Sequence, residues 1–326
     1  MSLRTISKIV SANSIPEGFG ASVLRSIGGR SPLRDLNPFL LFDHFIATNN
    51  KGFPEHPHKG QETITYVLNG RIAHEDFTGS KGVLYKGDLQ FMTAGKGIVH
   101  LEMPMENEDL TPTIGLQLWV DLPKHLRGTE PRYRDLKTWE IPQVVDQDGK
   151  VKIRVISGKY NDVNSVKDLA YTPIHFYHGT LQPGSHFRIN TPRDFNFFTY
   201  IINGTLSGLT PSSDKSAGRL QNIIYNNDGD YVEGVNNSDG EVEFVTVGGQ
   251  ILDQTYKKYG PFIGDTKAEV ETAFDDYEAG VNGFERVLNW KSTISEGVET
   301  GDLKALGGSL AEREIERLEY LKMKKT

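Results

Sequence analysis

Two short stretches of the sequence each place two metal-binding side chains two residues apart. The first contains His56 and His58, and the second contains His100 and Glu102. In a β-strand, side chains at positions i and i+2 point to the same face of the sheet. We therefore expect each pair to share a face. Two such strands lying side by side would direct four ligands at one point.

Three neutral imidazoles and one carboxylate suit a first-row divalent metal such as iron, manganese, nickel, copper or zinc. A single His-x-His pair is more often structural or exposed than metal-binding. Here, however, five of the nine histidines lie between residues 44 and 100, and a segment that reads as β-hairpins separates the two pairs. This context favours a metal site. A six-coordinate metal would keep open positions for substrate and dioxygen, whereas zinc would favour a closed, structural tetrahedral site.

The segment between the pairs has the alternation and turn residues of short β-strands. A strand that ends at Asn69-Gly70 is followed by a second one, as in a hairpin. The strands that the pattern predicts in this part of the chain are 62–68, 71–76, 82–85, 89–93 and 113–120.

The second half of the chain repeats the theme of the first. Residues 198–205 resemble residues 63–71, and residues 227–230 resemble residues 86–88. Between the halves, residues 122–150 are rich in proline and charge, and we interpret them as a linker. The second copy contains histidines but neither a His-x-His nor a His-x-Glu pair, so we expect it to bind no metal.

Short strands, frequent glycine turns and a duplicated unit predict an all-β protein. The architecture that they favour is two tandem double-stranded β-helices, the jelly-roll barrels of cupins, with short helices at the C-terminal end. The mouth of such a barrel is wide enough for one ligand. We expect a metal-binding N-terminal barrel at 1–130, a C-terminal barrel without metal at 131–294, and an extension at 295–326 with a terminal amphipathic helix.

Two helices are predicted near the end of the chain, with capping boxes that begin at Thr266 and Ser309. The second helix carries an apolar stripe that includes Ile315 and Leu318, and we expect this stripe to dock on the body of the protein rather than to bind a partner. Residues 296–308 are polar and rich in glycine. We expect that segment to be loose.

Composition limits the classes of function. The chain has 326 residues, of which 37% are hydrophobic and 24% charged, as in a soluble globular protein of two domains. The absence of cysteine excludes disulfides and thiolate ligands. A net charge of −7 argues against a broad nucleic-acid-binding surface. No apolar run suits a membrane span or a signal peptide. We expect a cytoplasmic protein that contacts neither membrane nor nucleic acid directly.

Eight segments of the chain follow one another in an order that is typical of one protein family. They are 37–40, 56–60, 73–77, 87–90, 92–104, 115–120, 259–262 and 282–286. Taken together, they resemble the pirin family, a branch of the cupin superfamily, and the resemblance extends from about residue 18 to residue 294.

The resemblance implies two cupin barrels with iron in the N-terminal one, held by His56, His58, His100 and Glu102. It also implies two kinds of function. Some pirins open the flavonol quercetin with dioxygen, and others are nuclear, redox-sensitive transcriptional co-regulators that bind transcription factors. The nucleus is therefore a second expected location. Gln61 stands where the family commonly has an aromatic residue.

The intact ligand set favours an enzyme. We expect an oxidoreductase of the quercetin 2,3-dioxygenase type, which uses Fe(II) to open a flavonol-like substrate with dioxygen. Glu62 or Glu102 would accept the proton of the substrate hydroxyl. The enzyme hypothesis also predicts an aromatic-sized cavity near the metal, with Phe53, Phe91 or Met92 in its wall. The alternative is a non-enzymatic redox-sensitive co-regulator with a transcription-factor partner, and a third interpretation is a metal-bound scaffold without redox chemistry.

The position of Glu62 depends on the local backbone. It has the same strand parity as His58, but four residues of straight strand would separate the two by about 13 Å. A bend at Gly60 would bring it back toward the histidines. We therefore place Glu62 below Glu102 as a ligand and retain it as a candidate base.

Overall fold

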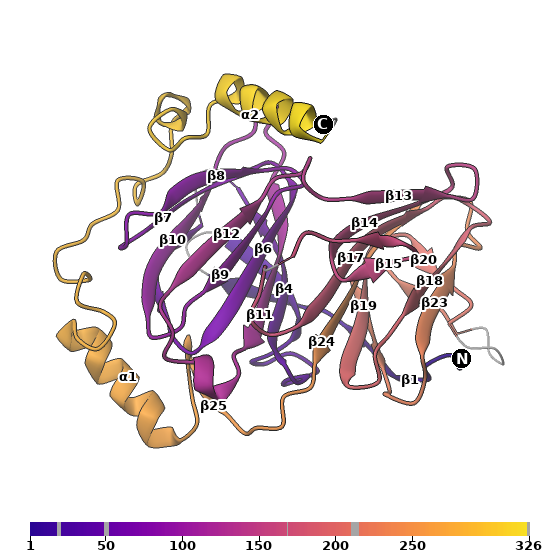
Figure 1. Ribbon diagram of the computed structural model, residues 1–326, viewed down its shortest axis with the longest axis horizontal. Coiled ribbons are helices and arrows are strands. Elements are labelled where there is room, and N and C mark those ends of the chain that lie inside the picture. Colours follow the sequence, from indigo (N-terminus) through magenta and orange to yellow (C-terminus); the bar gives the residue numbers. More distant parts are fainter. Residues whose placement is uncertain (18–20, 49–51, 168, 210–214, 325–326) are drawn as a thin grey trace. The chain divides into compact units, whose positions relative to one another are not determined.

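The computed structural model describes residues 1–17, 21–48, 52–167, 169–209 and 215–324 (Figure 1). Most of these residues form β-strands, and the two α-helices lie near the C-terminal end. The chain divides into two compact units. We call "first barrel" the unit of Ser14–Val23, Phe42–Glu140 and Gln254–Thr326, and "second barrel" the unit of Met1–Asn13, Leu24–Leu41 and Ile141–Asp253. The domain boundaries expected at residues 130 and 294 stay a prediction.

The large sheet of the first barrel has seven strands in the order β12-β9-β6-β11-β4-β3-β2, and a four-stranded sheet has the order β5-β10-β7-β8. The strands of these two sheets are β2 (Asn13–Glu17), β3 (Ala21–Ile27), β4 (Phe39–Ala47), β5 (Phe53–His58), β6 (Gln61–Asn69), β7 (Arg71–Asp76), β8 (Lys81–Tyr85), β9 (Leu89–Thr93), β10 (Ile98–Pro104), β11 (Thr113–Asp121) and β12 (Arg132–Leu136). The hairpin predicted at Asn69-Gly70 joins β6 to β7.

The second barrel repeats this arrangement. Its seven-stranded sheet has the order β1-β22-β19-β24-β17-β14-β13, with β18-β23, β20-β21 and β15-β16 as separate pairs. The strands are β1 (Ile6–Ser11), β13 (Gln143–Asp146), β14 (Val151–Ser157), β15 (Lys159–Tyr160), β16 (Val163–Asn164), β17 (Ile174–Leu181), β18 (His186–Asn190), β19 (Phe195–Asn203), β20 (Thr205–Leu206), β21 (Ala217–Gly218), β22 (Gln221–Tyr225), β23 (Tyr231–Val235) and β24 (Val242–Gln250).

The strands from β4 to β11 correspond one by one, in chain order and in sheet position, to the strands from β17 to β24. The predicted all-β fold with a duplicated cupin unit is therefore confirmed. Of the two internal matches, residues 198–205 do overlap β19, which occupies the place of β6. The other match was wrong, because residues 86–88 precede β9 whereas residues 227–230 precede β23, the counterpart of β10.

The stretch that we interpreted as a linker is largely structured. After a short 3-10 helix, η1 (Lys124–Leu126), the chain forms β12 at the edge of the first barrel's large sheet. It then forms β13 at the edge of the second barrel's sheet. The charges and prolines at 122–150 are those of edge strands, where proline and charge are tolerated because one side of the strand has no ladder partner.

The C-terminal segment of the first barrel behaves in the opposite way from our expectation. The stretch from 296 to 308, which we expected to be loose, buries Val298, Leu303 and Leu306 in a cluster with Leu101 and Met103 of β10. These two β10 side chains have the parity opposite to His100, so the segment covers the outer face of that sheet. A short 3-10 helix, η2 (Thr300–Leu303), lies within it.

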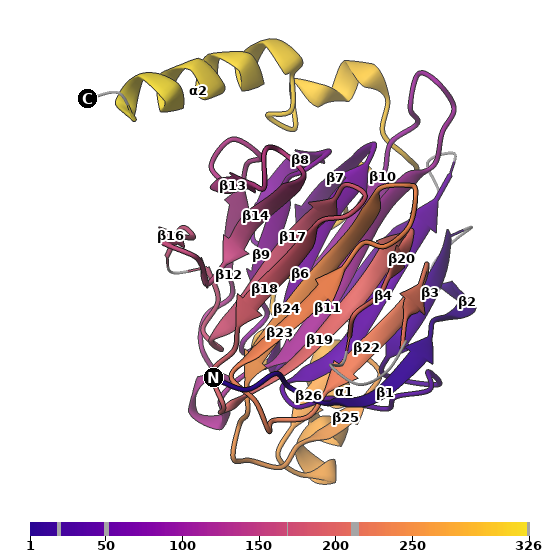
Figure 2. The ribbon, with the colours of Figure 1, turned by 90° about the vertical axis from the view of Figure 1, so that its right-hand side faces the viewer.

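The final helix, α2 (Leu310–Met323), starts at Ser309, whose hydroxyl accepts the Glu312 amide as the capping pattern predicts. It begins above β8 and then extends away from it (Figure 2). Its first turn is attached by Arg313, whose guanidinium binds Asp88 at 2.7 Å. The predicted docking of the apolar stripe was wrong, since Ile315 is 57% exposed and no α2 residue is buried.

The other helix, α1 (Lys267–Ala279), has the predicted cap, because the Thr266 side chain accepts the Glu269 amide. Val270 and Ala273 are buried against the first barrel, and β25 (Lys257–Tyr259) pairs with β26 (Phe262–Gly264) just before the helix. None of the described helices is both long and apolar enough to cross a membrane.

In the second barrel, the His175 ring packs among aromatic side chains. Its ring centroid lies 5.1 Å from that of Phe195, 5.8 Å from that of Phe197 and 5.9 Å from that of Tyr177. Burial, partly offset by the charge of Asp194, lowers the pKa of His175 to about 4. The imidazole is therefore neutral at pH 7.

This burial predicts a pH dependence of stability. The unfolded chain has a histidine pKa of about 6.5, so between about pH 6.5 and 4 it binds a proton that the folded barrel does not. We expect His175 to cost the fold up to about 3 kcal/mol as pH falls through that window, and nothing above it. Urea unfolding of the native protein and of His175→Gln at neutral and acidic pH measures this cost. A stability difference between the two that is the same at every pH would contradict it.

Candidate metal centre

The pairing of β5 with β10 brings three of the predicted ligands together. The two strands are antiparallel, with His56 opposite His100 and His58 opposite Ile98. Because cross-strand partners share a face, all three imidazoles point into the barrel. Each histidine offers a ring nitrogen, and these three atoms lie within 4.8 Å of one another. The ring centroids are 4.5 to 5.1 Å apart.

Burial keeps the rings of His58 and His100 uncharged. His58 is fully buried and His100 is 1% exposed. Burial, with the repulsion of His56 next in size, lowers the pKa of both rings well below the ordinary histidine value. Neutral imidazole is the form that binds a metal, so the protein presents these ligands without first removing a proton.

The free nitrogens of the three rings fit a metal ion. The Nδ1 of His56 lies 2.7 Å from the carbonyl oxygen of Pro54, which fixes the proton on Nδ1 and leaves Nε2 with a lone pair. The Nε2 of His58 and both ring nitrogens of His100 are buried and have no hydrogen-bond partner among the described residues. Buried polar atoms without a partner are costly, and a bound cation would satisfy them.

A tight turn at Gly60 supplies a side chain that holds His58. Gly60 has φ +79°, and a Cβ there would lie 2.3 Å from the carbonyl oxygen of Ile263. The turn returns the chain so that the Gln61 amide nitrogen lies 2.7 Å from Nδ1 of His58. The amide orientation that frees Nε2 for a metal is the one in which Gln61 Oε1 accepts the proton of Nδ1. On its other side, His58 contacts the Trp119 ring edge to face at 4.9 Å.

Glu102 lies beside this group but not within it. A register shift between His100 and Glu102 places Glu102 opposite Phe53 rather than opposite a histidine of β5. The carboxylate is buried, and its Oε1 accepts a hydrogen bond of 2.7 Å from the Thr65 hydroxyl. The role of Glu102 as a fourth ligand therefore stays a prediction.

A buried polar network lies next to Glu102. On β7, His74 is the ladder partner of Glu102, and Gln90 Nε2 lies 3.0 Å from both His74 Nε2 and Asp135 Oδ1. Burial raises the pKa of Asp135, but the neighbouring His74, whose Nε2 lies 3.7 Å from Oδ2, together with Lys137 and the Gln90 amide, brings the net value down to about 2. An ionised Asp135 thus fixes His74 beside Glu102.

The structure places Glu62 on the side of β6 that faces away from the histidines. Along β6, Gln61 and Thr65 contact His58 and Glu102, so residues of odd number face the barrel interior. By strand alternation, Glu62 faces the other way, and its Oε1 accepts a hydrogen bond from Thr93. The bend at Gly60 returns Gln61, not Glu62, to the histidines. The alternation therefore favours Glu102 over Glu62 as the acid closest to the metal centre.

Strand alternation also shows which of the residues expected in the cavity wall face the barrel interior. Met92 is the ladder partner of Thr63 and shares the interior face, whereas Phe91 pairs with Ile64 on the other face. Sequence reasoning missed Trp119 and Thr65 as neighbours of the site. Both lie in predicted strands, but which face they present depends on a cross-strand register that the sequence alone does not define.

Both units are jelly-roll barrels with the same strand order, and the first barrel brings three histidines together. These features define a bicupin with a candidate metal centre. The family model for pirin matches residues 20–120, and that for the pirin C-terminal cupin domain matches residues 176–283. The chain therefore belongs to the pirin family.

Relatives span nearly the whole chain. A pirin-like protein of Arabidopsis thaliana is 40% identical over 89% of this chain and 93% of its own, and human pirin is 40% identical over 85% and 93%. Among solved structures, quercetin 2,3-dioxygenase from Acinetobacter baumannii has 26% identity and a TM-score of 0.77, covering 86% of this chain and 98% of that one. A bacterial pirin of Escherichia coli, solved in complex with nickel(II), has 18% identity and a TM-score of 0.55, covering 75% and 99%, and shows the same fold.

The contact between Gln61 and His58 generates a prediction. Gln61→Leu removes the acceptor that orients the ring, so we expect its affinity for a divalent metal to fall about 10- to 100-fold. Gln61→Glu keeps an acceptor and should retain affinity close to the native value. Competition with a chromophoric chelator measures both. Equal metal affinity in Gln61→Leu and the native protein, with both folded by circular dichroism, would refute this role.

Proposed function

We propose that this pirin is a metal-dependent dioxygenase that opens a flavonol such as quercetin. The observation that carries the proposal is the group of three histidines, of which His58 and His100 are buried and neutral, whose free nitrogens converge on one point of the first barrel. Three protein nitrogens around a six-coordinate metal leave positions for substrate and dioxygen. A site built only for structure has no need of such positions.

The comparisons support the substrate class. Nearly the whole length of the quercetin 2,3-dioxygenase from Acinetobacter baumannii aligns with this chain, at 26% identity. We propose Fe(II) as the metal, because histidines with a nearby carboxylate and open positions are typical of non-haem iron oxygenases. Other first-row divalent metals suit the same donors.

His56, His58 and His100 would hold the metal, with Glu102 as a fourth ligand or as the adjacent base. When bound, Fe(II) would supply the binding and activation of substrate and dioxygen. His56 is partly exposed while His58 and His100 are buried, so the solvent side of the site is the side of His56. The substrate would approach from there.

The protein's own groups would handle the proton. Oxygen attack on a flavonol requires the substrate hydroxyl to lose its proton, and a buried carboxylate is a suitable acceptor. Glu102 faces the interior and holds one oxygen on the Thr65 hydroxyl, which leaves its other oxygen for the substrate. The buried surroundings strengthen each hydrogen bond to the substrate, because water no longer competes for it.

Oxygen uptake tests the proposal. We expect the protein, reconstituted with Fe(II) under anaerobic conditions, to consume dioxygen when quercetin is added. The double variant His56→Ala, His58→Ala should lose the metal and the uptake together. Uptake that persists in that variant, or a native protein with iron bound and no uptake, would contradict the proposal. The second result would favour the alternative of a redox-sensitive transcriptional co-regulator and direct the search to protein partners.

The same assay shows which of the two predicted carboxylates, Glu102 or Glu62, accepts the proton of the substrate. We expect Glu102→Gln to lower the rate at least about 100-fold, as for loss of a general base. Glu62→Gln is the matched control. It also removes one carboxylate, but from the face of β6 that points away from the barrel interior. A larger loss in Glu62→Gln would give the role to Glu62 instead.

A further inference from the structure

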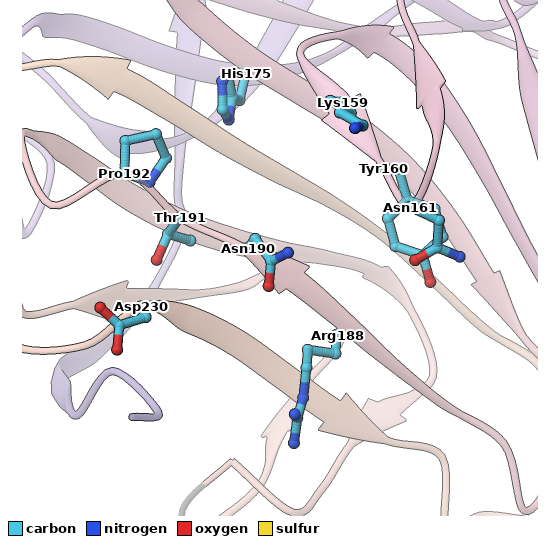
Figure 3. Close-up of a pocket in the computed structure, with 9 residues that line it drawn as sticks. All are labelled: Lys159, Tyr160, Asn161, His175, Arg188, Asn190, Thr191, Pro192 and Asp230. Atoms are coloured by element: carbon cyan, nitrogen blue, oxygen red, sulfur yellow. The ribbon is translucent and has the colours of Figure 1, made fainter. Parts of the chain in front are cut away.

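The second barrel has a groove of about 340 Å³ (Figure 3). Its charged side chains are engaged within the protein. Arg188 pairs with Glu233 and stacks on the Tyr231 ring. Figure 3 shows its guanidinium pointing away from Lys159. The described lining therefore offers no group of side chains that converges on a ligand. By contrast, the apolar side chains of α2 in the first barrel lie together and exposed.

Exposed apolar side chains are concentrated on α2. In the described part of the chain, twelve large hydrophobic side chains are exposed, and five of them belong to this one helix. At about 100° per residue, four of the five lie within about 140° of one another around the helix axis. We call these four side chains the α2 stripe: Leu310, Ile315, Leu318 and Leu321. A contiguous exposed apolar surface is typical of a site that binds another molecule.

The first turn of α2 is fixed to the first barrel by its polar side. Arg313 binds the carboxylate of Asp88, which is fully buried, at 2.7 Å. The Arg313 guanidinium also lies over the rings of Tyr85 and Trp139, 4.5 and 4.6 Å from the ring centroids. Just before the helix, the carbonyl oxygen of Gly308 accepts a hydrogen bond from the Tyr85 hydroxyl. These contacts define which side of α2 faces the barrel.

The attachment turns the α2 stripe away from the barrel. Arg313 and Tyr320 are seven residues apart and therefore lie on the same side of the helix. Among the described residues of α2, only these two are partly buried. Leu318 lies about 140° around the helix from Arg313, so the stripe faces solvent. Beyond its first turn, the helix extends away from β8 (Figure 2).

This exposure leaves α2 without most of the packing that stabilises helices in proteins. The helix has 14 residues, and helices of this length are marginal in water on their own. Tertiary packing of an apolar face normally supplies the missing stability. A partner that covers the α2 stripe would supply it here.

The charges of α2 favour a second copy of the same helix as that partner. Residues 310–316 carry three acids and one base, and the base is Arg313, which is already bound to Asp88. Residues 317–324 carry three bases and one acid. An antiparallel pair places the acidic half of each helix against the basic half of the other, whereas a parallel pair opposes like charges. With four acids and four bases in total, the helix lacks the excess of lysine and arginine that is typical of membrane-binding helices.

We propose that α2 is a self-association element through which two copies of this protein form a dimer. The two helices run antiparallel, the α2 stripes cover each other, and Ile315 and Leu318 lie near the two-fold axis. Two-fold symmetry closes the contact, so the assembly stops at two copies. Two helices of this length bury less surface than a standard interface, and we expect a dissociation constant on the order of tens of micromolar. The contact does not depend on a metal in the first barrel.

Sedimentation velocity at increasing protein concentration tests the proposal. We expect the native protein to change from monomer to dimer between about 5 and about 500 µM, the range around such a dissociation constant. Leu318→Glu places a charge in the middle of the contact and should leave the protein monomeric up to about 500 µM. Leu288→Glu is the matched control, because Leu288 is an equally exposed leucine of the first barrel outside α2. It should dimerise as the native protein does.

Charge reversal tests the antiparallel pairing itself. One variant combines Glu312→Lys with Glu316→Lys, and another combines Lys322→Glu with Lys324→Glu. Each alone opposes like charges across the pair and should dimerise more weakly than the native protein, whereas an equal mixture of the two should recover the dimer. Circular dichroism checks that every variant is folded.

Three results would overturn the proposal. The first is a native protein that stays monomeric up to about 500 µM, a concentration well above the expected dissociation constant. If that monomer sedimented with anionic vesicles, the stripe would bind a membrane instead. The second is a dimer that Leu318→Glu leaves intact or that Leu288→Glu weakens equally, since the contact would then lie elsewhere. The third is a mixture of the two charge variants that dimerises no better than either one alone.

Discussion

The candidate metal centre depends on the burial of uncharged imidazoles on two paired strands. His58 and His100 are almost completely buried, and three of their four ring nitrogens have no partner in the described part of the chain. Burying so many unsatisfied polar atoms costs free energy, which the hydrophobic packing of the barrel must offset. On the outer face of the same sheet, the segment that contains Leu303 and Leu306 covers Leu101, which lies between His100 and Glu102 in β10. The packing of the C-terminal segment thus supports the strand that carries His100.

The duplicated barrel shows that one scaffold can carry a group of histidines in one copy and an apolar core in the other. Both large sheets have the same strand order, and both barrels place a short strand pair beside it. In the first barrel that pair carries histidines, which suit a cation. In the second barrel, the side chains of β18 and β23 that face the core are apolar, among them Phe187, Ile189 and Val232, and the ion pair of Arg188 with Glu233 lies on the opposite face. Fold alone therefore does not define function, and the side chains at equivalent strands determine the chemistry.

The sequence was sufficient for the fold class and for the grouping of three histidines, because both follow from local periodicity. The i, i+2 spacing of His56 and His58 needs only a strand, and the Asn69-Gly70 turn needs only two residues. Features that depend on strand register could not be predicted from the sequence. Whether Glu62 or Gln61 faces His58 is decided by a one-residue turn at Gly60, and a shift of one residue reverses the face. The docking of Leu303 in place of the α2 stripe depends on tertiary packing, which amphipathic patterning does not specify.

X-ray absorption spectroscopy of the Fe(II)-loaded protein tests the central claim most directly, because the scattering pattern of imidazole rings reports how many histidines bind the metal. We expect three imidazole ligands in the native protein and two in the His58→Ala variant, with the remaining ligands being oxygen. A native spectrum with fewer than two imidazoles, or a spectrum that the His58→Ala substitution leaves unchanged, would show that the metal binds elsewhere and would contradict the account.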